Sequence, residues 1–189
     1  RTAAFQAVNR SSILRGAAIY PQHTMDNKVI YPPKYEEIKG PVIFLAGPIQ
    51  GAPDWQKEVI KIIHSLRPDV YIASPRRDYL DEEFVYEKQV DWETEYLNRA
   101  ANNGAIIFWL AKEFKHDCKR AYAQTSRFEI AEWKARYEKS KFNLIIGIED
   151  GFTGGRYIKH RVSQDCPDIK ILDSLEEVCR NALENVFPS

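Results

Sequence analysis

Cysteine, histidine and methionine are scarce in this chain of 189 residues, which contains three cysteines, four histidines and one methionine. The cysteines show no CxxC spacing, and their odd number fits a reducing compartment better than a disulfide framework. The histidines are scattered and form no pattern with the cysteines that is typical of metal ligands. We therefore expect neither a disulfide scaffold nor a bound metal.

An excess of charge of either sign is also missing, because 27 lysines and arginines balance 27 aspartates and glutamates. That balance argues against a binding groove for nucleic-acid polymers and against a polybasic membrane patch. No apolar run approaches the roughly 18 residues of a membrane-spanning helix. The length and a hydrophobic content of 44% predict one domain with a sizeable core. We expect a cytoplasmic protein.

Residues 1–24 differ from the rest because they contain arginines and serines but no aspartate or glutamate. This composition resembles that of an organelle transit peptide. The alternative is a leader with little order that precedes a domain starting at Met25, the single methionine. Both interpretations separate residues 1–24 from a folded domain at residues 25–189.

From Val42 onward, short apolar runs alternate with amphipathic stretches. The runs have the length of buried strands and lie at residues 42–46, 70–73, 105–110, 144–148 and 169–172. The intervening stretches have the apolar spacing of helices, at residues 55–66, 92–101, 125–137 and 175–183. Continuous apolar strands that alternate with helices predict a mostly parallel five-stranded sheet with helices on both faces.

Polar residues before these stretches predict where helices begin. Asp54 and Asp91 have the side chain of an N-cap, and Ser174 and Glu177 have the spacing of a capping box. In such a sheet, ligands bind beyond the carboxyl ends of the strands. We therefore expect the site in the loops that follow the first three apolar runs.

The loop after residues 42–46 begins with Gly47 and Pro48 and matches neither a P-loop nor a dinucleotide-binding motif. We expect no cofactor. The next loop contains Arg76 and Arg77, which could bind a phosphate or carboxylate, or could equally be surface charges. Asp78 follows them and is a candidate carboxylate.

Glu129 has two interpretations. With Ser126 it matches a capping box, in which the glutamate only binds the backbone at the helix start. Alternatively it is a nucleophile, which the helix macrodipole keeps ionised at the strand ends. The spacing alone favours the cap, whereas the position beyond the third apolar run favours catalysis.

Taken together, these segments resemble the nucleoside 2-deoxyribosyltransferase-like family, in order from about Val29 to Val186. The resemblance is carried by the segments 28–33, IFLAGPI at 43–49, SPRR at 74–77, VDWE at 90–93, IFWL at 107–110 and TSRFEI at 125–130. It implies a flavodoxin-like, doubly wound fold in a single domain. It also implies retaining transfer of deoxyribose between nucleobases, in which Glu129 attacks C1′ and forms a glycosyl-enzyme.

The resemblance suggests further site residues. Asp78 or Asp91 would donate a proton to the leaving base. The expected substrate contacts come from the loops and helix starts: Gly47, Pro48, Ile49, Trp55, Arg76, Arg77, Trp92, Asn103 and Thr125. Several family members have an aspartate just before the third predicted strand, which is at residues 105–110 in this chain. Here that position is Asn103, whose side chain cannot supply an acidic proton.

The resemblance also implies the partners, which are a nucleoside, a free nucleobase and further copies of the chain in a homo-oligomer. Two alternatives to base transfer stay open. One is a nucleoside or nucleoside 5′-monophosphate hydrolase, in which water replaces the acceptor base. The other is a nucleotide-sensing domain without catalysis.

Overall fold

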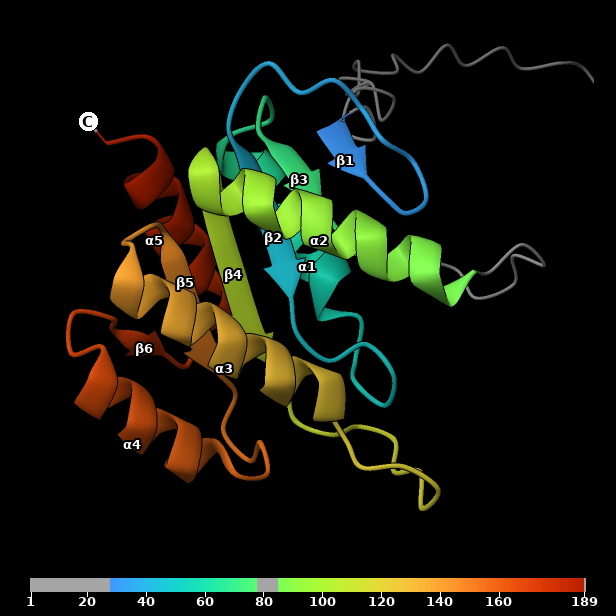
Figure 1. Cartoon of the computed structure of the whole chain (residues 1–189), viewed down its shortest axis with the longest axis vertical. Helices are drawn as coiled ribbons and strands as arrows, with labels where there is room; N and C mark the ends of the chain where they lie inside the picture. Colours follow the sequence, from blue (N-terminus) through green and yellow to red (C-terminus); the bar gives the residue numbers. More distant parts are fainter. Residues whose placement is uncertain (1–27, 78–84, 189) are drawn as a thin grey trace, which may run out of the picture.

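The computed structural model of the chain describes residues 28–77 and 85–188, so the predicted leader at residues 1–24 and the candidate Asp78 lie outside the described residues. Within these ranges the chain forms six strands and five helices (Figure 1). The strands are β1 (Val29–Ile30), β2 (Val42–Ala46), β3 (Tyr71–Ala73), β4 (Gly104–Leu110), β5 (Leu144–Ile148) and β6 (Ile171–Leu172). The helices are α1 (Trp55–Leu66), α2 (Tyr86–Asn102), α3 (Gln124–Lys139), α4 (Gly155–Asp165) and α5 (Leu175–Val186). None of these helices is long and apolar enough to cross a membrane.

All neighbouring strands pair in parallel, in the order β1-β3-β2-β4-β5-β6. Phe44 at the centre of β2 lies beside Ala73 of β3 and beside Ile106 of β4. The predicted five strands are present, and β1 adds a sixth at the edge next to β3. Without β1 the order is that of the flavodoxin-like fold, in which strand order reverses between β2 and β4. The expected fold class is confirmed.

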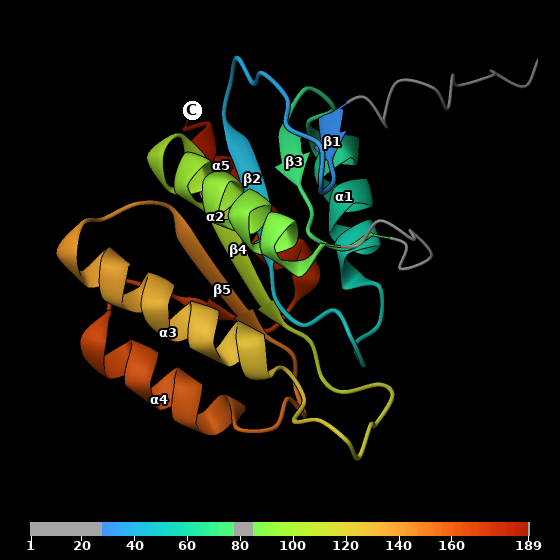
Figure 2. The same ribbon diagram turned by 45° about the vertical axis from the view of Figure 1, so that its right-hand side comes forward.

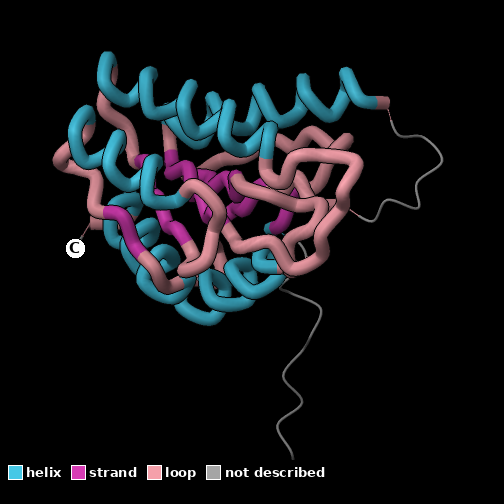
Figure 3. Tube along the Cα trace, turned by 90° about the horizontal axis from the view of Figure 1, so that it is seen from below, coloured by secondary structure: helices cyan, strands magenta, loops and turns pink. Residues whose placement is uncertain are grey.

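Helices cover both faces of the sheet (Figure 3). One face packs against α2, α3 and α4, and the other packs against α1 and α5. The side chains of each strand alternate between the two, so that Phe44 and Ala46 face the first group while Ile43 and Leu45 face the second. Both faces are therefore buried, which explains why the strands are continuous apolar runs in the sequence.

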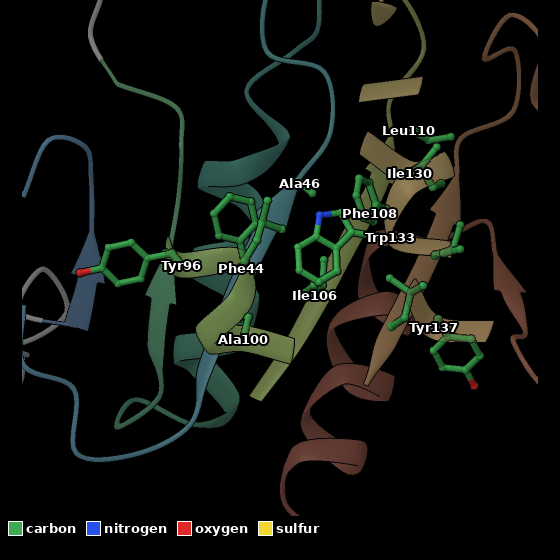
Figure 4. Packing of buried hydrophobic residues seen from close by; sticks show 14 of the residues in the cluster. Phe44, Ala46, Tyr96, Ala100, Ile106, Phe108, Leu110, Ile130, Trp133 and Tyr137 are labelled. Carbon is green, nitrogen blue, oxygen red and sulfur yellow. The ribbon is translucent and has the colours of Figure 1, made fainter. Parts of the chain in front are cut away.

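Aromatic side chains fill the space between the sheet and helices α2 and α3, where Phe44, Phe108 and Trp133 gather (Figure 4). On α2, the rings of Trp92 and Tyr96 lie 4.6 Å apart between centroids, and both are fully buried. The Nε1–H of Trp92 donates to the carbonyl of Lys34 at 2.6 Å. These contacts hold α2 in a fixed position over the sheet.

Two of the predicted helix starts are confirmed. The Asp54 carboxylate accepts a hydrogen bond from the Lys57 amide at 3.2 Å, and the Ser174 hydroxyl accepts one from the Glu177 amide at 3.5 Å. Both caps satisfy a backbone N–H that has no partner within the helix. They begin α1 and α5, which cover the face of the sheet opposite α2, α3 and α4.

The other two predicted starts are wrong, and one helix was not predicted. α2 begins at Tyr86, so Asp91 lies within the helix rather than capping it. α3 begins at Gln124, after Ala123 with a left-handed φ of 54°, and no side chain caps it. Ser126 is already inside the first turn, so the capping box with Glu129 does not form. The helix that was not predicted is α4, which begins at Gly155.

Candidate functional site

A cavity of about 600 Å³ lies at the carboxyl end of β2, between α2 and α3. Its walls come from β2, the loops after β2, β3 and β4, one face of α2, and α3 as far as Arg136. Figures 1 and 2 show α2 and α3 side by side over the same face of the sheet. Because strand order reverses between β2 and β4, this is the place where doubly wound folds bind their ligands.

The loop after β2 approaches the cavity through Gly47, which has a φ of 146°. A Cβ atom at this position would lie 2.2 Å from the carbonyl oxygen of Trp109 and 2.9 Å from the indole of Trp55. The Nε1–H of Trp55 donates to the Pro48 carbonyl at 2.8 Å. Trp55 is buried beneath the loop, so it fixes the loop from below and does not line the cavity.

Replacing Gly47 tests whether the backbone of this loop can accommodate a side chain at position 47. Gly47→Ala is expected to lower the free energy of unfolding by roughly 2 kcal/mol or more, because the backbone of Trp109 cannot move aside and the φ is unfavourable for alanine. Urea denaturation measures the loss. Gly40→Ala is the matched control, since its Cβ would meet no atom within 4 Å. Equal stability of the two variants would show that the loop adapts.

Arg76 holds the same loop from its other side. Its guanidinium donates to the carbonyls of Ile49 and Pro53, both at 3.0 Å, and to the side chain of Gln56 at 2.9 Å. It also forms an ion pair with Asp54 at 3.3 Å. Arg76 is therefore a structural residue outside the cavity wall.

Glu93 and Gln89 stand one turn apart on the face of α2 that lines the cavity. The Gln89 Nε2–H donates to the Glu93 carboxylate at 2.6 Å and to the Pro75 carbonyl at 3.2 Å. Burial raises the pKa of Glu93, while the hydrogen bond from Gln89 and the positive charge of Arg77 oppose that rise. The arrangement provides a carboxyl group that can hold or release a proton.

Glu129 lines the cavity from the second turn of α3. Burial, followed by the negative charges of Glu93 and Glu132, raises the pKa of Glu129 to about 8. The sequence-based expectation of a carboxylate kept ionised by the helix macrodipole is therefore wrong for the free protein. The dipole acts mainly within the first turn, and at Glu129 the loss of hydration outweighs it.

The later turns of α2 and α3 are tied to each other. Arg136 forms an ion pair with Glu132 at 2.6 Å and donates to the side-chain oxygen of Asn98 at 3.2 Å. All three residues line the cavity. The hydrogen bond from Arg136 to Asn98 thus bridges the two helices at this end of the cavity.

A scan against protein families matches residues 40–151 to the family described as nucleoside 2-deoxyribosyltransferase like. This range covers more than half of the chain and contains β2 to β5 with the helices between them. The chain belongs to this family. A search among curated proteins found no match. The family implies nucleosides or nucleobases as small-molecule substrates.

The residues predicted for the site fall into two groups. The cavity is lined by Gly47, Pro48, Ile49, Arg77, Thr125 and Glu129. It is not lined by Trp55, Arg76, Asp91, Trp92 or Asn103. Asn103 ends α2 and precedes β4, so it lies at the amino end of the sheet, opposite the cavity.

The prediction missed Glu93, which stands on the cavity wall of the deoxyribosyltransferase-like domain where Asp91 was expected to act. Asp91 is exposed and does not line the cavity. The error follows from starting the helix at Trp92 instead of Tyr86. With the correct start, the four-residue spacing of Gln89, Glu93 and Leu97 would have placed them on one face of α2.

Proposed function

We propose that the protein transfers 2-deoxyribose between nucleobases through a covalent intermediate on Glu129. The observation that carries the proposal is the pair of carboxyl groups, Glu93 and Glu129, on facing helices of one cavity at the strand switch point. Retaining and inverting glycosidases alike use two carboxyl groups in one pocket. One attacks the sugar, and the other carries the proton of the leaving group.

The first half of the reaction forms the covalent bond. An oxygen of the Glu129 carboxylate attacks C1′ of the deoxynucleoside, and the bond from C1′ to the base nitrogen breaks. The electron pair of that bond stays with the base, which receives a proton from Glu93. The Gln89 amide is hydrogen-bonded to Glu93 and favours the carboxylate that this transfer leaves behind.

The second half reverses these steps with a new base. A nitrogen of the acceptor base attacks C1′, the bond from C1′ to the Glu129 oxygen breaks, and Glu129 returns as a carboxylate. The proton of the acceptor nitrogen passes to the ionised Glu93. The enzyme is regenerated with the same charge, and no cofactor takes part in either half.

For these reaction steps, Glu93 and Glu129 together must hold one proton. The raised pKa of Glu129, about 8, arises partly from the charge of Glu93, so the two groups titrate as a pair. In the singly protonated pair, the proton lies on Glu129 or on Glu93. The second arrangement is the reactive one, because it combines an ionised nucleophile with a proton donor.

A second candidate reaction is hydrolysis of a nucleoside or a nucleoside 5′-monophosphate on the same pair. Arg77 and Arg120 line the cavity and bring positive charge to it, which suits a phosphate. Arg76, the other arginine considered for this role, is engaged with the loop after β2. Water would then replace the acceptor base in the second half of the reaction.

A base-exchange assay separates these functions. Deoxyadenosine incubated with free cytosine is expected to yield deoxycytidine and adenine, which chromatography resolves. Deoxyadenosine and its 5′-monophosphate are also tested without cytosine. Release of adenine without exchange would assign the hydrolase instead. Thermal stabilisation by nucleosides without any turnover would assign a sensing domain and contradict both reactions.

The proposal includes a homo-oligomer, in accordance with the expectation from the family resemblance. Sedimentation at several concentrations, run beside the exchange assay, measures the subunit number.

A further inference from the structure

Arg127 lies on α3 two residues before Glu129 but does not line the cavity. Successive residues of an α-helix are about 100° apart around its axis, so these two side chains leave the helix on nearly opposite sides. α3 itself lies between α2 and α4 (Figures 1 and 2). Glu129 lines the cavity that α3 shares with α2, whereas Arg127 contacts the loop after β5, residues 149–154, which leads into α4.

The guanidinium of Arg127 joins the start of α3 to this loop. One of its terminal nitrogens donates to the Thr153 carbonyl at 2.5 Å, and Nε makes a longer hydrogen bond of 3.5 Å to the Tyr122 carbonyl. Its central carbon lies over the ring of Phe152, 4.7 Å from the centroid. A Cβ atom at Gly154 would lie 2.8 Å from the Arg127 Nη1 atom. The guanidinium is thus in close contact with three consecutive residues of the loop.

The loop after β5 is itself attached to the sheet. The Glu149 amide donates to the Leu110 carbonyl at 3.1 Å, and the Glu149 carboxylate accepts a hydrogen bond from the Lys112 amide at 2.9 Å. The Phe152 amide donates to the Glu149 carbonyl at 3.1 Å, and the Phe152 side chain is buried. Leu110 is the last residue of β4, a central strand. Through this loop, Arg127 therefore attaches α3 to the sheet.

The start of α3 has little support of its own. No side chain caps this helix, and no acidic residue lies in its first turn to complement the helix dipole. Helix ends of this kind tend to fray. The hydrogen bond from Arg136 to Asn98 joins α3 to α2, but it lies about two turns beyond Glu129. Arg127 supplies a polar contact at the end of α3 that precedes Glu129.

We propose that Arg127 is a positioning residue that holds the Glu129 carboxyl group where it can attack C1′. The inference rests on the proposed function. The two residues belong to one turn of α3, so a shift of the backbone at Arg127 moves Glu129 with it. Displacement of a reacting group by about 1 Å can lower the rate of reaction about 100-fold. Arg127 itself touches no reacting atom and acts only through Glu129.

Single-turnover kinetics with deoxyadenosine test this role, with the rate constant for release of adenine as the readout. Arg127→Met removes the guanidinium and is expected to lower this rate constant about 100-fold. Arg127→Lys keeps a positive charge near Phe152 but has one nitrogen in place of the planar fork, so the expected loss is only about tenfold. Arg161→Met is the matched control, because it removes a guanidinium on α4 that pairs with Asp165 outside the cavity, and it should react at the wild-type rate.

Two further readouts separate positioning from stability. Each rate constant is measured at a temperature at which thermal melting shows the variant to be folded, so a merely structural role leaves it unchanged. The deoxyadenosine concentration that gives half the maximal rate should stay close to that of the wild type, because Arg127 does not line the cavity. We therefore expect the loss in Arg127→Met to appear in the maximal rate and to be partly restored in Arg127→Lys.

The failures of this inference and of the proposed function are distinguishable. A wild-type rate constant in folded Arg127→Met, beside an active wild type, overturns the positioning role and leaves the proposed function intact. If Arg127→Met does not fold, a wild-type rate constant in Arg127→Lys overturns the role in the same way. An equal loss of rate in Arg161→Met would also overturn it. A wild-type protein that releases no adenine overturns the proposed function, and the positioning role with it.

Discussion

Glu129→Gln is expected to abolish base exchange, lowering kcat/KM by a factor on the order of 10⁴ or more while the fold persists. The amide keeps the size of the side chain but cannot form the bond to C1′. Exchange and hydrolysis share this first step, so both reactions should disappear together. Single-turnover assays with deoxyadenosine, followed by mass spectrometry for a glycosyl adduct, measure the loss. Unchanged exchange in this variant would contradict the assignment of the nucleophile.

The stability of the same variant provides an independent readout. Glu129 in the folded protein has a pKa of about 8, raised from 4.5, whereas in the unfolded chain it ionises near its ordinary pKa. The wild type therefore loses stability as the pH rises from about 4.5 to 8, because ionisation favours the unfolded chain. Glu129→Gln has no carboxyl group at this position and does not undergo this loss. Between pH 4.5 and pH 8, its free energy of unfolding should therefore rise, relative to that of the wild type, by on the order of 2–4 kcal/mol. Urea denaturation at both pH values tests the sign, with Glu138→Gln on α3 as the control.

Glu93→Gln is expected to lower kcat/KM by roughly 10²- to 10⁴-fold and to change the shape of its pH profile. In the wild type, kcat/KM should fall above about pH 8, where the pair of carboxyl groups loses its last proton. Glutamine at position 93 removes both the proton donor and a negative charge beside Glu129. The pKa of Glu129 should therefore decrease, and the falling limb of the profile should disappear.

A control two residues away makes this prediction specific. Asp91→Asn changes a carboxyl group on the same helix that is exposed and outside the cavity. It should retain the activity and the pH profile of the wild type. Loss of exchange in Asp91→Asn, together with full activity in Glu93→Gln, would restore Asp91 as the proton donor.

The strands could be predicted from the sequence because burial on both faces requires apolar side chains at every position. Val42–Ala46 and Leu144–Ile148 were predicted with the bounds that the structure has. The parallel sheet also predicted that the site lies in the three loops at the carboxyl ends of the strands. β1 has only two residues, too few for a strand pattern, and it lies in segment 28–33, which contributed only to the family resemblance.

The roles at the site were less predictable, because they depend on where each helix starts and how deeply each carboxyl group is buried. Neither α2 nor α3 has a capping side chain, and the polar residues that resembled caps lie inside these helices. Asp91 was therefore chosen over Glu93. The charge state of Glu129 depends on its burial and on two acidic neighbours, of which Glu93 comes from α2, far away in the chain.

Arg76 has a consequence for the thermodynamics of ligand binding. The carbonyls of Ile49 and Pro53 are bound to its guanidinium before any substrate arrives, so folding has already immobilised the loop that borders the cavity. A nucleoside then does not have to order this segment, and less conformational entropy is lost on association. The backbone of this loop should move by less than about 1 Å between the free and the bound protein. Affinity would then reflect the fit of the substrate to a preorganised cavity wall.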